Sequence, residues 1–199
     1  MNNLTENMSK TQDKYLLSLL PKNYMWLTET SLQNICREYI FPNHNILCNK
    51  RLYVEETFII PDITIPDLKL VIEFQGYQHY TNCIQVHKDT KRKQLLRAND
   101  WNILEIPYFV QLSTAVLTTC FKKYKSRNEK WCDQSNSFPH GFVHPKAILP
   151  GCFCISGIEI YKTNLEFFPN EVRQRCIETV RQRSKILKIP PRVLDPVNF

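Results

Sequence analysis

An apolar run at residues 68–75, reading LKLVIEFQ, constrains the fold more strongly than any other part of this chain. The run predicts a β-strand that ends at Gly76. The two-residue period of a strand assigns four side chains to one face: Lys69, Val71, Glu73 and Gln75. A buried carboxylate is costly unless it is compensated. Glu73 is therefore expected either to help bind a cation or to form an ion pair with Lys69 or His79.

The segments around this strand predict the order strand, strand, helix, strand. Residues 52–57 and residues 58–65 each predict a strand before the apolar run. The second of these strands can pair with the run as a hairpin. Residues 86–99 show a helical pattern, and Asn99 is expected to adopt the left-handed conformation at its end. Residues 101–107 favour a final strand, parallel to its predecessor in the sheet through a right-handed crossover.

The chain is expected to divide into three parts. Residues 1–14 resemble a flexible tail, residues 15–125 contain the α/β core, and residues 126–199 form a mainly helical or irregular C-terminal extension. Beyond the segments already described, helices are predicted at residues 15–20, 32–40, 112–123 and 169–188. Ser31 is expected to cap the second of these helices.

Composition narrows the classes of function. The chain has 26 Lys and Arg against 19 Asp and Glu, a formal charge of +7 and a pI near 9.0, which favours a polyanionic partner or an acidic surface. Residues 1–14 carry no signal or transit pattern, so an intracellular protein is expected. No apolar run approaches the roughly 18 residues that cross a bilayer, so no membrane partner is expected. The eight cysteines are then reduced thiols or metal ligands, and the four glycines form no phosphate-binding loop.

Asp62 and Glu73 are the most informative pair of side chains. Asp62 follows Pro61, which is tolerated at a strand edge or bulge, and lies eleven residues before Glu73. If their strands pair through Pro66 and Asp67, both carboxylates can lie on one face. Mg²⁺ takes one or two carboxylates, fills its octahedron with water and phosphate oxygens, and can activate a water for attack on phosphate. From its own sequence context, Asp62 is equally well explained as a turn residue.

These residues belong to an ordered set that resembles the PD-(D/E)xK superfamily of nucleases, near its very-short-patch mismatch repair endonucleases and related homing-type and viral nucleases. The set comprises an acid before an apolar strand, an E-x-Q-G-x-x-H ending, a basic helix and a final strand. In this chain it is carried by Asp62, Glu73, Gln75, Gly76, His79, Asp89, Lys91, Arg92, Asn99, Asp100, Trp101 and Ile106. The resemblance covers about fifty residues and implies a restriction-endonuclease-like core, with a central mixed sheet flanked by helices, between residues 58 and 109.

The resemblance also implies roles for individual residues. Asp62 and Glu73 would bind Mg²⁺ or Mn²⁺, with the Phe74 carbonyl as a further ligand. Gln75 stands where the superfamily usually has lysine, and it would orient a water or a phosphate, or leave activity reduced. His79 would act as a general acid or base, or hold a phosphate, although a lone histidine after a strand is more often a turn residue.

The missing lysine and the first helix leave two questions open. Two residues could take the place of the missing lysine. Lys69 shares the predicted strand face with Glu73, and Lys91 could reach back to the site from the following helix. We favour Lys91. In many members of this superfamily, an acidic residue of the first helix also belongs to the site. Here Gln33 lies near that place and Glu38 about one turn later.

Two groups of basic residues are candidates for contacts with phosphates. The first comprises Lys69 with the helical residues Lys88, Lys91, Arg92, Lys93 and Arg97. The second extends along the predicted C-terminal helix and comprises Arg173, Arg175, Arg181, Arg183, Lys185 and Lys188. A basic helical surface is often only a solvated face, so the resemblance is what favours nucleic acid as the partner.

A further group of cysteine and histidine residues has the chemistry of a structural zinc site. Its members are Cys132, His140, His144, Cys152 and Cys154. The group contains no CxxC pair, so ordinary buried cysteines are the default interpretation.

Three hypotheses follow. The first is an Mg²⁺- or Mn²⁺-dependent endonuclease that hydrolyses phosphodiester bonds of DNA. The second is a catalytically inactive module that binds RNA or DNA, because the stretch from His79 to Phe109 also resembles the RAP domain of organellar RNA-binding proteins. The third is a structural or regulatory protein that keeps the fold without the reaction, for which Gln75 is the main argument. The sequence leaves the oligomeric state and the sequence specificity open.

Overall fold

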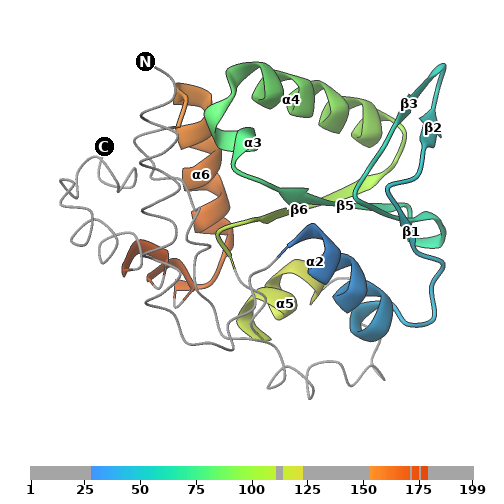
Figure 1. Ribbon diagram of the computed structural model, residues 1–199, viewed down its shortest axis with the longest axis horizontal. Helices are drawn as coiled ribbons and strands as arrows, with labels where there is room; N and C mark the ends of the chain where they lie inside the picture. Colours follow the sequence, from blue (N-terminus) through green and yellow to red (C-terminus); the bar gives the residue numbers. More distant parts are fainter. Residues whose placement is uncertain (1–27, 111–113, 123–152, 171, 175, 179–199) are drawn as a thin grey trace, which may run out of the picture.

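The computed structural model describes residues 28–110, 114–122, 153–170, 172–174 and 176–178. Within these ranges the fold is mixed α/β, with a four-stranded sheet, a separate two-stranded hairpin and helices on both sides of the larger sheet (Figure 1). Helix α4 (Cys83–Ala98) lies on one side, and α2 (Glu29–Ile35) and α5 (Thr114–Phe121) lie on the other. The predicted mixed sheet flanked by helices is therefore present.

The larger sheet has the strand order β1-β4-β5-β6. Its strands are β1 (Leu47–Cys48), β4 (Ile63–Ile65), β5 (Leu70–Gln75) and β6 (Asn102–Pro107). β1, β4 and β5 pair antiparallel, whereas β5 and β6 pair parallel. Because α4 connects the two parallel strands, the predicted parallel pairing across a helical connection is confirmed.

Strand β5 occupies the centre of the sheet and is covered on both faces. Leu70 and Ile72 are fully buried in the larger apolar cluster, together with residues of α2 and α5. Val71 lies in a second cluster with Val54 and Leu96, a residue of α4. The apolar run of β5 is thus explained by burial on both sides, as in sheets that contain parallel strands.

The prediction that Lys69 shares a strand face with Glu73 is wrong. The segment Pro66–Leu68 forms the short 3-10 helix η2, and Lys69 follows it in the left-handed conformation with φ of 45°. Because that backbone conformation breaks the two-residue alternation, the strand begins at Leu70, and the exposed Lys69 side chain stays outside the face that carries Glu73.

The prediction of one strand over residues 58–65 is also wrong. β2 (Leu52–Val54) and β3 (Thr57–Ile59) pair with each other as a separate hairpin, and β4 starts only at Ile63. Pro61 lies in the break, where its missing N–H cannot continue a hydrogen-bonded ladder.

Helix α4 begins earlier than predicted. Asn82 caps it by accepting hydrogen bonds from the backbone N–H groups of Ile84 and Gln85. At its other end, Asn99 has φ of −106° and Asp100 has φ of 63°. Asp100, rather than Asn99, therefore takes the left-handed position that allows the chain to turn into β6.

The first described helix likewise differs from its prediction. α2 starts at Glu29, three residues before the predicted start, and continues as the π-helix η1 (Cys36–Ile40). Leu32, Cys36 and Ile40 are buried beneath the sheet. The predicted helices at residues 15–20 and beyond residue 178, and the predicted tail at residues 1–14, lie outside the described residues.

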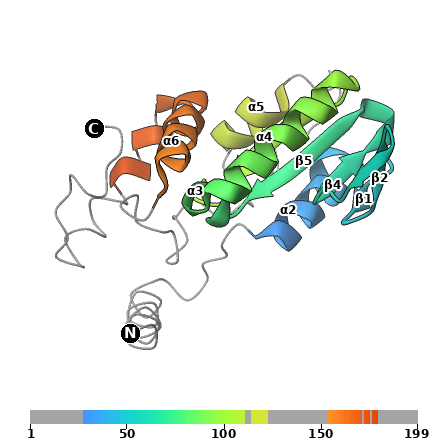
Figure 2. The same ribbon diagram turned by 90° about the horizontal axis from the view of Figure 1, so that it is seen from above.

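Helix α6 (Ile155–Phe167) packs at one end of the sheet, beside α3 (Gln78–Thr81) (Figures 1 and 2). Its anchor is Tyr80, whose carbonyl oxygen accepts a 3.0 Å hydrogen bond from the Cys154 N–H and whose hydroxyl accepts a 2.8 Å hydrogen bond from Asn164. The described part of the predicted C-terminal extension thus belongs to the same apolar cluster as the sheet.

We predict that Gly157→Ala destabilises the protein. A Cβ atom at this position would overlap the backbone carbonyl of Tyr80, so α6 must move away from α3. We expect a loss of about 1–3 kcal/mol in the free energy of unfolding, measured by urea denaturation. Ser156→Ala is the control, because this neighbouring side chain is exposed. Equal stability of the two variants would contradict the close approach of α6 to Tyr80.

Candidate active site

Asp62 and Glu73 lie side by side at the point where β4 begins. The antiparallel register of β4 and β5 pairs Ile63 with Ile72, so the residues next to them, Asp62 and Glu73, face each other across the strands. The Asp62 carboxylate accepts a 2.7 Å hydrogen bond from the backbone N–H of Phe74. The connection through Pro66 therefore brings the two carboxylates to one place, as the sequence predicts.

The Glu73 carboxylate is buried, with only 5% of the residue exposed. Its Oε2 atom lies 3.5 Å from a guanidinium nitrogen of Arg92, and its Oε1 atom is buried without a hydrogen-bond partner among the described residues. The basic group beside Glu73 is thus Arg92, rather than the expected Lys69 or His79. This single contact satisfies only one of the two carboxylate oxygens.

The electrostatic environment of Glu73 disfavours its ionised form. Burial raises the pKa of this carboxyl group to about 8, against the attraction of Arg92 and with added repulsion from Asp62, Asp89 and Glu105. Burial also raises the pKa of Asp62; the Phe74 N–H opposes this shift and the charge of Glu29 adds to it. Three acidic residues, Asp62, Asp89 and Glu105, therefore oppose the ionisation of Glu73, and the guanidinium of Arg92 favours it.

Gln75 is part of a second polar contact on the same face of β5. Its amide donates a 3.0 Å hydrogen bond to Glu105, the residue that the parallel register pairs with Glu73. Lys93 of α4 lies 3.1 Å from both carboxylate oxygens of Glu105. Gln75 and Lys93 of α4 thus share the carboxylate of Glu105.

The favoured replacement for the missing lysine, Lys91, is not brought into the site. On α4, Asp89, Arg92 and Lys93 point toward the sheet, whereas Lys91 is exposed. Two helical positions from Asp89 correspond to about 200° around the helix, which turns Lys91 to the outer side. Lys88 and Arg97 are exposed there too, so all three remain candidates for phosphate contacts.

His79 forms a dyad with Asp89. Nδ1 of His79 lies 2.6 Å from Asp89 Oδ2, and the second oxygen of Asp89 accepts hydrogen bonds from Gln85 and Arg92. Burial of Asp89 raises its pKa, but the hydrogen bonds from His79 and Gln85 and the electrostatic attraction of His79 and Arg92 outweigh this effect and hold the pKa below its usual value. The dyad fixes the imidazole ring and directs Nε2 away from Asp89.

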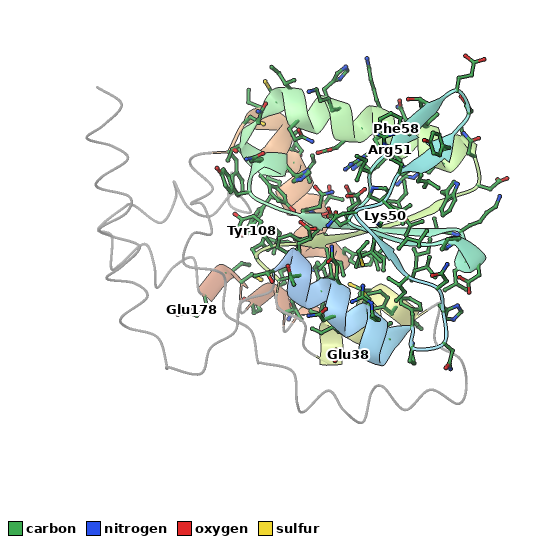
Figure 3. The ribbon with its side chains drawn as sticks, turned by 45° about the vertical axis from the view of Figure 1, so that its right-hand side comes forward. Glu38, Lys50, Arg51, Phe58, Tyr108 and Glu178 are labelled. Carbon is green, nitrogen blue, oxygen red and sulfur yellow. The ribbon has the colours of Figure 1, made fainter. Side chains whose placement is uncertain are left out.

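An acid from the first helix is present, and sequence reasoning missed it. Glu29 accepts hydrogen bonds of 2.9 Å from Gln33 and 2.8 Å from Asn49. Gln33 also donates to the backbone carbonyl of Asp62 at 3.2 Å, which connects α2 to the carboxylate pair. Glu38 lies in the middle of η1 and is exposed (Figure 3). The i, i+4 spacing of Glu29 and Gln33 was the available signal, but the helix was expected to start too late to include Glu29.

The residues present fit a hard cation. The Oε1 atom of Glu73, which has no hydrogen-bond partner among the described residues, and the carboxylate of Asp62 are ligands of the type that Mg²⁺ and Mn²⁺ prefer. The Phe74 carbonyl, which accepts from Gly76 N–H at 3.0 Å, retains a second lone pair. Among the described residues, no three His, Cys, Asp or Glu side chains converge to enclose a metal. An ion here would depend on water and phosphate oxygens for the rest of its shell.

The other candidate residues are only partly covered by the structure. Cys154 lies at the start of α6, where its thiol donates to the Tyr80 carbonyl at 3.4 Å. Arg173 is near α6, and its guanidinium donates to the Glu166 carbonyl at 3.4 Å. The remaining members of these groups lie outside the described residues: Cys132, His140, His144, Cys152, Arg175, Arg181, Arg183, Lys185 and Lys188. The zinc site and the basic C-terminal helix therefore stay predictions.

We predict that Glu73→Gln stabilises the metal-free protein at alkaline pH. The folded protein keeps the Glu73 proton up to about pH 8, whereas an ordinary glutamate releases it near 4.5. Stability is therefore lost as the pH rises between these values, and the variant escapes this loss. In EDTA we expect a gain of about 2 kcal/mol or more at high pH, and little difference in mildly acidic buffer. Glu56→Gln, at the exposed turn of the hairpin, controls for loss of a charge. A pH-independent difference would contradict the buried, unpaired carboxylate.

No protein-family model, curated protein or solved structure matches this chain. None of the helices in the described part is long and apolar enough to cross a membrane. The function is therefore inferred from the residues and their geometry.

Proposed function

We propose that this protein is a metal-dependent endonuclease that hydrolyses phosphodiester bonds of DNA, and that its larger sheet is the core of a restriction-endonuclease-like fold. One observation carries the proposal. Glu73 buries a carboxylate oxygen that has no hydrogen-bond partner in the described part of the chain, directly beside Asp62. Burying such an atom is costly, and a divalent cation would satisfy it. A purely structural ion pair accounts for the Arg92 contact but leaves this oxygen unexplained.

The order of the elements supports the same proposal. An acid precedes β4, a second acid lies in β5, and a helix with basic residues leads to the parallel strand β6. This is the order of features that the resemblance to PD-(D/E)xK nucleases implies. The acid of the first helix, Glu29, adds a further feature of that pattern near Asp62.

Different residues of the site would have different roles in hydrolysis. Asp62 and Glu73 would hold the ion, with the Phe74 carbonyl. When bound, Mg²⁺ or Mn²⁺ supplies charge stabilisation and an activated water. Arg92 and Lys93 provide positive charge in the same polar layer for a phosphate whose charge grows during the reaction. His79, held through Nδ1 by Asp89, can exchange a proton at Nε2 with the attacking water or the leaving oxygen.

A second candidate is a nucleic-acid-binding protein without catalytic activity. The observation that favours it is the hydrogen bond between Gln75 and Glu105, since a neutral amide stands where nucleases of this type usually have a lysine. Lys93 reaches the same carboxylate and can restore the positive charge. For this reason we favour the active enzyme.

We predict that Asp62→Asn and Glu73→Gln each abolish metal-dependent nicking of supercoiled plasmid while DNA binding is retained. Each change removes one negative ligand of a hard cation and keeps the size of the side chain. The assay uses Mg²⁺ or Mn²⁺, with Asp67→Asn as the matched control, because Asp67 is exposed on η2 and pairs with His44. A wild-type protein that binds DNA but never nicks it would favour the inactive candidate.

We further predict that Lys93→Gln lowers the nicking rate about 100-fold, as expected for loss of one electrostatic group in a catalytic site. Lys91→Gln, two residues away on the exposed side of α4, should leave the rate within a few-fold of wild type. Single-turnover rates with saturating protein separate this effect from weaker binding. If Lys91→Gln were the more damaging change, the assignment of the positive charge to Lys93 would be wrong.

A further inference from the structure

The hairpin formed by β2 and β3 exposes two aromatic rings on its outer face. Tyr53 and Phe58 are direct partners across the two strands, with ring centroids 6.1 Å apart. Tyr53 is 69% exposed and Phe58 is 45% exposed. The guanidinium of Arg51 lies 4.6 Å from the centroid of the Phe58 ring, and Lys50 precedes it along the same side of the molecule (Figure 3).

The core of the protein does not require these rings. The inner face of the hairpin already anchors it, because Val54 packs with Val71 and Leu96, and Leu52 and Ile59 pack around them. At the turn, Glu55 accepts a 2.9 Å hydrogen bond from Asn99 at the end of α4. The inner face of the hairpin is thus packed against the core, whereas its aromatic pair is exposed on the outer face. This exposure makes the pair a candidate for binding a ligand.

Both ends of the hairpin lead directly to Asp62. Before β2, the Asn49 N–H donates a 3.2 Å hydrogen bond to the Asp62 carbonyl. After β3, only Ile60 and Pro61 separate Ile59 from Asp62. Phe58 lies four residues before Asp62, so their Cα atoms are at most about 14 Å apart. Since each nucleotide of one strand in duplex DNA advances about 3.4 Å along the helix axis, that separation corresponds to a few nucleotides.

We propose that Tyr53 and Phe58, with Arg51 and Lys50, form a stacking surface for unpaired bases of the DNA strand that is bound at Asp62 and Glu73. This inference rests on the proposed function, and it adds the recognition of single-stranded DNA. Aromatic rings stack on bases of any sequence, Arg51 extends the stack, and Lys50 offers positive charge to the backbone. The net charge of +7 favours a polyanion as the occupant.

The test measures binding in EDTA, so that it does not depend on cleavage. The full-length chain is titrated into a fluorescein-labelled single-stranded oligodeoxynucleotide and into the matching duplex, with fluorescence anisotropy as the readout. We expect Tyr53→Leu and Phe58→Leu each to weaken binding of the single strand roughly tenfold, because leucine keeps apolar volume but cannot stack. The variant Phe58→Trp, which keeps an aromatic ring, should bind the single strand about as tightly as the wild type. Phe167→Leu is the matched control, since Phe167 is an exposed ring on α6, at the other end of the sheet.

The possible outcomes are distinct. Unchanged affinity in both leucine variants, or loss of affinity that Phe58→Trp fails to restore, overturns the inference. So does a wild-type protein whose sedimentation shows self-association that the leucine variants abolish, because the rings would then contact a second copy of the chain. Plasmid nicking with Mg²⁺ is measured separately. Absent nicking together with ring-dependent binding would reject the endonuclease and leave the stacking surface supported.

Discussion

The buried carboxylate of Glu73 is the constraint on which the rest of the polar layer depends. It sits in β5, between Asp62, which directly precedes β4 on one side, and Glu105 of β6 on the other. Arg92 is close to one of its oxygens, and the other has no partner among the described residues. Burying a carboxylate at this position lowers the stability of the fold. Residues that lower stability in this way are commonly kept where the function depends on them.

The contacts of α4 follow from this constraint. The helix turns Asp89, Arg92 and Lys93 toward the sheet, where they meet His79, Glu73 and Glu105 respectively. His79 is followed by Tyr80, which anchors α6 through its carbonyl and hydroxyl groups. A segment more than seventy residues later in the chain therefore supports the position of the histidine. This arrangement explains why the described part of the C-terminal region packs with the core.

Much of the fold could be predicted from local patterns. The apolar run of β5, the helix after it and the parallel pairing of β6 follow from periodicity and chain connectivity. The proximity of Asp62 and Glu73 follows from the short connection between their strands. The errors arose where backbone geometry breaks a period: the left-handed Lys69 shortens β5, and Pro61 divides the expected strand into a hairpin and β4. Likewise, the sequence shows several lysines on one helix, but only the position of that helix over the sheet selects Lys93 rather than Lys91.

The most direct test of the central claim is calorimetric titration of Mg²⁺ into the metal-free chain, performed with the wild type and with Glu73→Gln. Saturable binding of about one equivalent by the wild type, lost in the variant, is the result expected when two carboxylates hold a hard cation. Equal uptake by the two proteins, or no saturable binding by the wild type, would contradict a metal site at Asp62 and Glu73.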